Sequence, residues 1–140
     1  MAVGNTFGAT ALSSYGGFWI SFAIILTPGG FDIVAEYATK DANGKATGAG
    51  VNDLNTVLGF FLMGWFIFTT ILLLCTLRST VAFFLLFFTL DFAFLMLGLG
   101  HLYSKNGKTN ASMIKAGGGF GMLAAFLAWY NALAGIADDR

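Results

Sequence analysis

Charged residues are scarce in this chain of 140 residues. It has 7 lysines and arginines and 7 aspartates and glutamates, which is 10% of the sequence and leaves a formal net charge of zero. Soluble domains are about 25% charged, so a soluble protein this apolar would lack the polar side chains to cover its core. The balanced charge also provides no basic surface of the kind that binds nucleic acid. The scarcity of charged residues favours a membrane protein.

Residues that build enzyme sites are equally rare. The sequence has one cysteine and one histidine, which excludes an intrachain disulfide and leaves no metal-ligand spacing. It contains no G-x-S-x-G motif, no P-loop and no dinucleotide-binding fingerprint. The glycine-rich run Gly117–Gly121 lies inside an apolar stretch and follows no strand, which argues against a phosphate-binding loop. We therefore expect neither an enzyme nor a cofactor.

Four long apolar stretches occupy most of the chain, at residues 7–27, 57–77, 81–100 and 113–136. Each has about the 20 residues that a helix needs to cross a bilayer. Because lipid offers no hydrogen-bond partner to a backbone N–H or C=O, such stretches must be helical. We predict an all-α membrane protein with four transmembrane helices, in a single transmembrane domain over residues 1–140.

Turn-forming and polar residues separate these stretches. Pro28 ends the first one, because proline cannot continue a helix. The polar segment that follows predicts a short interfacial helix at residues 31–37, and Asp53 or Asn55 as the cap of the second spanning helix. Only residues 78–80 separate the second and third stretches, which predicts a tight antiparallel hairpin.

Basic residues predict an orientation in the membrane. Four spans place both termini on one side, together with Arg78 and Arg140. The opposite side carries Lys40, Lys45, Lys105, Lys108 and Lys115. Because cytoplasmic loops carry the excess of lysine and arginine, this distribution predicts termini outside the cell.

The last stretch carries a stripe of small residues at spacings of three and four. These are Gly118, Gly121, Ala125, Ala128, Ala132 and Gly135. Small residues allow two helix backbones to approach closely where lipid provides no hydrophobic driving force. The stripe is therefore either a helix-packing surface or part of the wall of a narrow pore for a small solute.

Polar residues also fall at membrane depth. Asp91 lies near the middle of the third stretch, where inserting an acid costs about 2.5–3.5 kcal/mol. It marks a solute or proton path, or it is a structural acid bonded to a hydroxyl on a neighbouring helix. Uncharged hydroxyls crowd the first stretch, where they serve a carboxylate in transit or bond other helices: Thr10, Ser13, Ser14, Tyr15 and Ser21.

Several motifs are spaced along the chain, beginning with the block from Gly4-Asn5-Thr6-Phe7-Gly8 through Ser14-Tyr15-Gly16-Gly17. The others cover almost the whole remaining chain: Leu58-Gly59-Phe60, Gly64-Trp65, Phe68-Thr69, Cys75-Thr76, Ser79-Thr80-Val81, residues 83–88, Gly100-His101, Ala116-Gly117-Gly118 and residues 128–132. Together these motifs resemble the acetate uptake transporter family, which includes fungal acetate and ammonia permeases and bacterial succinate–acetate permeases. The first block resembles that family's third transmembrane helix.

The resemblance implies hexamers of six-helix subunits, each with its own path, of which this chain corresponds to helices 3–6. The family's first-helix signature, Asn-Pro-Ala-Pro-Leu-Gly-Leu, is absent, so we expect an N-terminally truncated chain. The implied function is transport of acetate or a similar small monocarboxylate across a fungal plasma membrane, with protons as a coupled partner. The alternative is a non-transporting membrane subunit or a remnant lacking the first two helices. The family's termini are cytoplasmic, opposite to the distribution of basic residues.

The resemblance also implies which residues line the path. The family's central constriction maps to Tyr15 and Leu90, and a position that limits substrate size maps to Ala128. Further pore-lining or proton-linked candidates are the polar residues Thr10, Ser14, Asp91 and Asn131, of which Asp91 adjoins Leu90.

Overall fold

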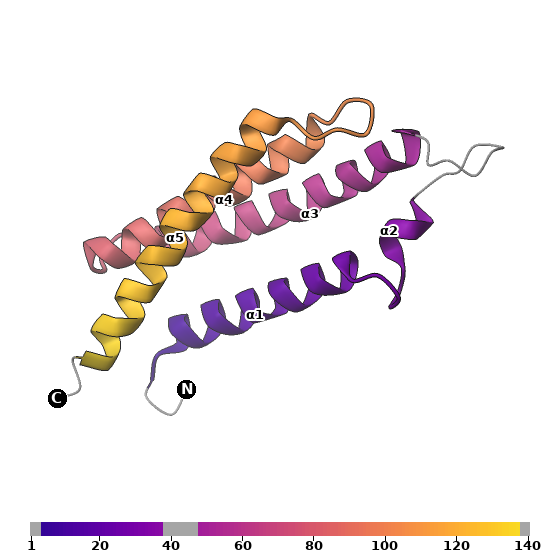
Figure 1. The fold of residues 1–140 in the computed structure, drawn as a ribbon. Coiled ribbons are helices and arrows are strands. Elements are labelled where there is room, and N and C mark those ends of the chain that lie inside the picture. Colours follow the sequence, from indigo (N-terminus) through magenta and orange to yellow (C-terminus); the bar gives the residue numbers. More distant parts are fainter. Residues whose placement is uncertain (1–3, 38–47, 138–140) are drawn as a thin grey trace. The chain divides into compact units, whose positions relative to one another are not determined.

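The structure of the protein is a computed structural model that describes residues 4–37 and 48–137 (Figure 1). The described residues form α1 (Thr6–Leu26), α2 (Ile33–Glu36), α3 (Gly48–Cys75), α4 (Val81–Leu102) and α5 (Ala111–Ala137). Four of these helices, all but α2, are long and apolar enough to cross a membrane. This confirms the predicted all-α class and the four spans. Three of the basic residues on which the predicted membrane orientation depends lie outside the described residues: Lys40, Lys45 and Arg140.

The chain divides into two units, Met1–Gly50 and Val51–Arg140. In the first unit, Asn5 caps α1 because its Oδ1 accepts a hydrogen bond from the Gly8 N–H at 2.8 Å. After α1 the chain turns, with Asp32 Oδ1 accepting from the Gly29 N–H at 2.9 Å. One helical turn, α2, then follows inside the predicted interfacial segment 31–37, which confirms a short helix there.

The second spanning helix begins earlier than predicted. α3 starts at Gly48, so Asp53 and Asn55 lie within the helix and neither is its cap. The polar residues at the start of α3 favour a loop when the sequence is considered alone, because they interrupt the apolar stretch. In the structure Asn52 has a distant partner instead, since its Oδ1 accepts from the Gly107 N–H at 2.8 Å. The first turns of α3 therefore contact the connection between α4 and α5.

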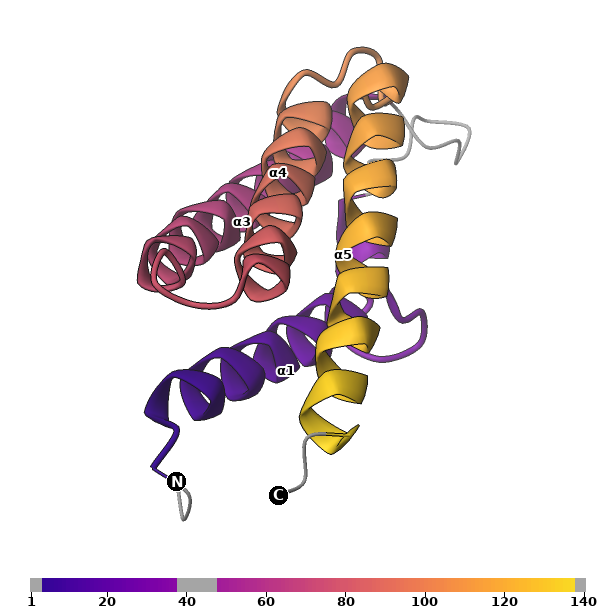
Figure 2. The ribbon, with the colours of Figure 1, turned by 90° about the vertical axis from the view of Figure 1, so that its left-hand side faces the viewer.

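A tight turn joins α3 to α4, as the three-residue connection predicted. α3 ends at Cys75, and the Ser79 N–H donates to the Thr76 carbonyl at 2.9 Å. Thr80 caps α4, because its Oγ1 accepts from the Phe83 N–H at 3.3 Å. The two helices run side by side in opposite directions in both views (Figures 1 and 2).

Glycines let the three helices of the second unit approach closely. A Cβ atom on Gly59 would lie 2.6 Å from Cγ of Leu102, which no real side chain could tolerate. Likewise a Cβ on Gly117 would lie 2.7 Å from Cγ of Leu97, so α5 packs on α4 at this glycine. Two glycines of α4 also lie close to side chains of neighbouring helices, because a Cβ would be 3.0 Å from Met63 at Gly98 and 2.7 Å from Ile114 at Gly100.

Candidate functional site

A buried acid joins α3 to α4. Asp91 lies at the middle of α4 and is 6% exposed. The Thr70 hydroxyl donates to Asp91 Oδ1 at 3.0 Å, and the same hydroxyl lies 2.9 Å from the Phe66 carbonyl oxygen. Sequence reasoning offered a bond to a hydroxyl on a neighbouring helix as one account of this acid, and the structure contains that bond. A role in a solute or proton path stays a prediction.

Leu90 and Ala128 are both half-buried, on adjacent antiparallel helices. The α4–α5 register is given by Leu97 beside Gly117 and by Ala82 bonded to Asn131. This register places Ala128 about five residues from Leu90 along the bundle, or roughly 7 Å at the rise of an α-helix. The two positions thus occupy nearby levels of one helix pair.

Asn131 ties α5 to the start of α4. Its Nδ2 donates to the Leu127 carbonyl at 2.7 Å and to the Ala82 carbonyl at 3.3 Å. An amide nitrogen has two hydrogens, so these bonds occupy both. Only the Oδ1 atom of Asn131 is left to act on a solute, and a pore-lining role for it stays a prediction.

The hydroxyl candidates of the first stretch lie on α1. Thr10 is exposed, while Ser14 and Tyr15 are half-buried. Nearby serines bond within their own helix: Ser13 Oγ donates to the Ala9 carbonyl at 2.7 Å, and Ser21 Oγ donates to the Gly17 carbonyl at 2.6 Å. Tyr15 belongs to the first unit and Leu90 to the second, so the constriction that pairs them stays a prediction.

Three glycines of the small-residue stripe of α5 have open space around them. Gly117 and Ala124 are the buried residues of this helix, and neither belongs to the stripe. No atom lies within 4 Å of a Cβ built on Gly118, Gly121 or Gly135. α5 therefore contacts α4 through Gly117, next to the stripe, whereas the glycines of the stripe itself do not touch a neighbouring helix among the described residues.

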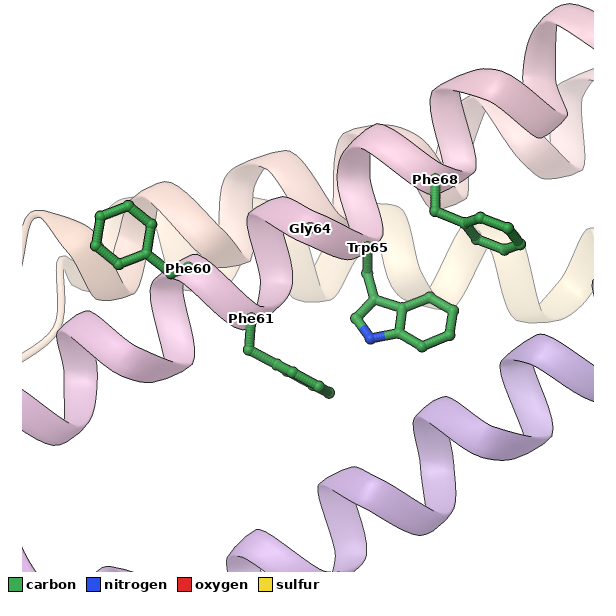
Figure 3. Close-up of a pocket in the computed structure, with 5 residues that line it drawn as sticks. All are labelled: Phe60, Phe61, Gly64, Trp65 and Phe68. Atoms are coloured by element: carbon green, nitrogen blue, oxygen red, sulfur yellow. The ribbon is translucent and has the colours of Figure 1, made fainter.

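Sequence reasoning missed an aromatic wall on α3. Phe61 and Trp65 project from the same side of the helix, and with Phe60, Gly64 and Phe68 they line an open hollow of about 440 Å³ (Figure 3). The Trp65 ring packs edge to face on Phe68, with centroids 5.5 Å apart. The spacing of residues 61, 65 and 68 is that of one helix face, so this signal was readable in the sequence.

Trp65 also connects this wall to α4, because its ring stacks on Phe94 at a centroid distance of 6.4 Å and an interplanar angle of 27°.

Closer to the start of α3, the Asn55 side chain is buried, and its Nδ2 has no hydrogen-bond partner among the described residues. A buried donor without a partner costs about 1–3 kcal/mol. Asn55 is thus a further functional candidate that sequence reasoning took for a helix cap.

Residues 1–140 match the model of the GPR1/FUN34/yaaH family. The chain belongs to this family. It is 66% identical to "Acetate permease A" of Emericella nidulans, over 99% of this chain and 45% of that protein. It is 45% identical to "Ammonia transport outward protein 2" of Saccharomyces cerevisiae, over 100% of this chain and 44% of that protein. No solved structure matches the chain.

A bacterial relative is more distant. The chain is 28% identical to "Succinate-acetate/proton symporter SatP" of Escherichia coli K12, over 98% of this chain and 62% of that protein. These names describe transporters rather than enzymes, and the resemblance stated from the motifs is confirmed. The chain spans less than half the length of the fungal relatives above. The names of these relatives therefore do not by themselves establish what this chain transports.

Proposed function

We propose that this integral membrane chain is part of a permease that moves acetate or a similar small monocarboxylate. The observation that carries the proposal is its 66% identity, over nearly its whole length, to a fungal acetate permease. The four apolar helices fit this role, because a transporter surrounds its solute with spanning helices. We place the permease in the plasma membrane of a fungus, on the strength of the fungal relatives.

We place the narrow part of the path at Tyr15 and Leu90. An apolar Leu90 offers a solute no hydrogen bond, so a ring of such residues sheds water and passes only small solutes. A tyrosine hydroxyl can replace part of the water around a carboxylate. A side chain larger than that of Ala128, at a nearby level on α5, would narrow the path and exclude bulkier acids. Thr10, Ser14 and the buried amide of Asn55 supply further neutral donors along the route.

Proton coupling is assigned to the pair of Asp91 and Thr70. A hydroxyl has one proton to donate and can also accept. With ionised Asp91, Thr70 donates to the carboxylate across 3.0 Å. With protonated Asp91, the acid donates to Thr70, which then donates to the Phe66 carbonyl at 2.9 Å. Thr70 can therefore stay bonded to Asp91 whether the acid is ionised or protonated.

We further propose that the chain works in one transmembrane domain within a hexamer. Two surfaces support further helix contacts: the open small-residue stripe of α5 and the aromatic wall of α3. Small residues are the usual contact between membrane helices, and aromatic side chains supply large apolar area.

Labelled-acetate uptake tests the proposed function. The protein is expressed in cells that lack their own acetate permeases. Their uptake of labelled acetate is compared with that of cells carrying the empty vector. We expect faster acetate uptake, reduced by excess unlabelled acetate or propionate. Surface labelling of the expressed protein controls for its delivery to the membrane. Uptake equal to the vector control, with the protein present at the surface, would refute the proposal.

A further inference from the structure

An open hollow of about 460 Å³ lies at the connection between α4 and α5, and none of the path residues named above lines it. Figure 1 shows this connection as the loop between the two labelled helices. Among the described residues that line the hollow, two are lysines and none is acidic: Tyr103, Lys105, Lys108, Thr109, Asn110 and Met113. The hollow is therefore positively charged and open to solvent.

The backbone holds the two lysines directly opposite each other. The Lys105 N–H donates to the Lys108 carbonyl at 2.9 Å, and the Lys108 N–H donates to the Lys105 carbonyl at 3.0 Å. Residues that are paired in this way place their side chains on the same face of the ribbon. Like charges directly opposite each other repel and destabilise the pair. An anion between the two ammonium groups removes that repulsion.

The turn that carries these lysines is held in place without any ligand. Asn106 and Gly107 both have positive φ, +52° and +75°, which is the two-residue turn that an Asn-Gly pair favours. Asn52 of α3 anchors the turn by accepting from the Gly107 N–H at 2.8 Å. The Asn110 N–H donates to the Gly100 carbonyl of α4 at 2.9 Å. The backbone that carries Lys105 and Lys108 is therefore held in place by hydrogen bonds to α3 and α4.

The remaining lining residues indicate the kind of anion. Tyr103 and Thr109 contribute hydroxyls that can donate to an oxygen, and Met113 contributes an apolar side chain. A small carboxylate fits this set, with its charged end between the lysines and its short alkyl end on Met113. The hollow lies within the range of small-ligand sites, about 300–1,000 Å³.

We propose that the Lys105–Lys108 hollow binds small carboxylate anions and concentrates them at this end of the bundle. The proposal rests on the proposed function for the choice of a carboxylate as cargo. A charged hollow raises the local concentration and arrival rate of its counter-ion, and the effect weakens as salt screens it. The hollow thus contributes to the apparent affinity for the solute rather than to its passage through the constriction.

A binding measurement tests the site without relying on transport. The protein, with ¹³C-labelled methionine methyl groups, is placed in phosphatidylcholine nanodiscs at about 10 mM ionic strength, where screening extends over about 30 Å. Acetate is titrated while the methyl signal of Met113 is followed, with exposed Met122 of α5 as the internal reference. Acetamide, which has the same shape and no charge, is the matched ligand control.

We expect acetate, but not acetamide, to shift the Met113 signal. The double variant Lys105→Gln/Lys108→Gln should raise the acetate concentration needed for half of the full shift about fivefold. This is the combined effect of losing two exposed ion pairs. Lys115→Gln removes the same charge from an exposed position outside the hollow and should leave the response unchanged. Lys105→Arg/Lys108→Arg keeps the charge and should keep the response, which separates loss of charge from loss of folding.

Three results of the binding measurement would overturn the proposal. The Met113 signal could respond equally to acetate and acetamide, or it could respond equally in the wild type and the double glutamine variant. It could also respond only to added anionic phosphatidylglycerol, which would assign the hollow to lipid headgroups. Uptake measured on the same variants separates the two proposals: a Met113 response without uptake refutes the permease alone. Uptake with an unchanged KM in the double variant refutes the concentrating role.

Discussion

The Thr70 hydroxyl donates to Asp91 Oδ1 at 3.0 Å from one helix to the next, and it lies 2.9 Å from the carbonyl oxygen of Phe66 in its own helix. One hydroxyl proton thus faces two acceptors, and only one of them can receive it at a time. The direction of this bond depends on whether Asp91 carries a proton. A single threonine therefore connects the charge state of a buried acid to the hydrogen bonding of α3.

Replacing Thr70 by valine should destabilise the helix bundle, and the size of the effect depends on whether Asp91 is neutral or ionised. A neutral hydrogen bond between membrane helices contributes about 0.6 kcal/mol on average. A bond to an ionised group contributes about 1.5–3 kcal/mol. Unfolding of the purified protein in detergent, followed by circular dichroism, gives the difference between the variant and the wild type.

Two other threonine variants control for this experiment. Thr70→Ser keeps the hydroxyl and should stay near the wild type. Thr56→Val removes an exposed hydroxyl of α3 that bonds the carbonyl of Asn52 in the same helix, so it should change stability little. Equal stability of Thr70→Val and Thr56→Val would mean that the contact to Asp91 contributes nothing.

Asp91→Asn should separate proton coupling from folding. The amide keeps the size of the side chain and can still bond Thr70, but it cannot take up a proton. In proteoliposomes we expect an inward proton gradient to accelerate acetate uptake by the wild type and to have no effect on the variant. Asp53→Asn, an exposed acid of α3, serves as the control and should keep the gradient response. A variant at Asp91 that still responds to the gradient would assign coupling to another group.

The spans were predictable because length and apolarity alone decide which segments cross a membrane. The start of α3 was not, because Asn52 and Asn55 look like loop residues until the contact of Asn52 with Gly107 is known. The turn at Asn106 and Gly107 was readable, since an Asn-Gly pair favours positive φ. Local chemistry is visible in the sequence, whereas contacts between distant segments are not.

The same limit applies to the candidate site. Asp91 was identified from the cost of burying an acid, but its partner Thr70 depends on the register of α3 against α4. Gly117 and Gly118 are adjacent and chemically identical, and only the rotation of α5 decides which of them contacts α4. A spacing of three and four residues identified a stripe of small residues without showing which helix, if any, lies against it.

Adjacent glycines therefore offer a sharp test of the α4–α5 contact. Gly117→Ala places a methyl group 2.7 Å from Cγ of Leu97 and 3.0 Å from its backbone nitrogen, which cannot move aside freely. Overpacking of this kind costs about 1–3 kcal/mol, measured as a lower unfolding midpoint in detergent. Gly118→Ala meets no atom within 4 Å and gains helix propensity, so it should be neutral or stabilising. The reverse order of stability would contradict the packing of α5 on α4.

Leu90 and Ala128 should control which acids pass, in opposite directions. Leu90→Ala removes side-chain volume at the proposed constriction, so uptake of propionate should rise relative to acetate. Ala128→Leu adds volume at a nearby level and should lower that ratio about tenfold, the lower end of what one or a few methylene groups change in a fitted pocket. Ala134→Leu, an exposed position of α5 outside the stripe, adds the same volume elsewhere and should leave the ratio unchanged. Competition between two labelled acids in one uptake assay gives the ratio without depending on expression level. If Leu90→Ala and Ala128→Leu both kept the wild-type ratio, the path would not run between these two residues.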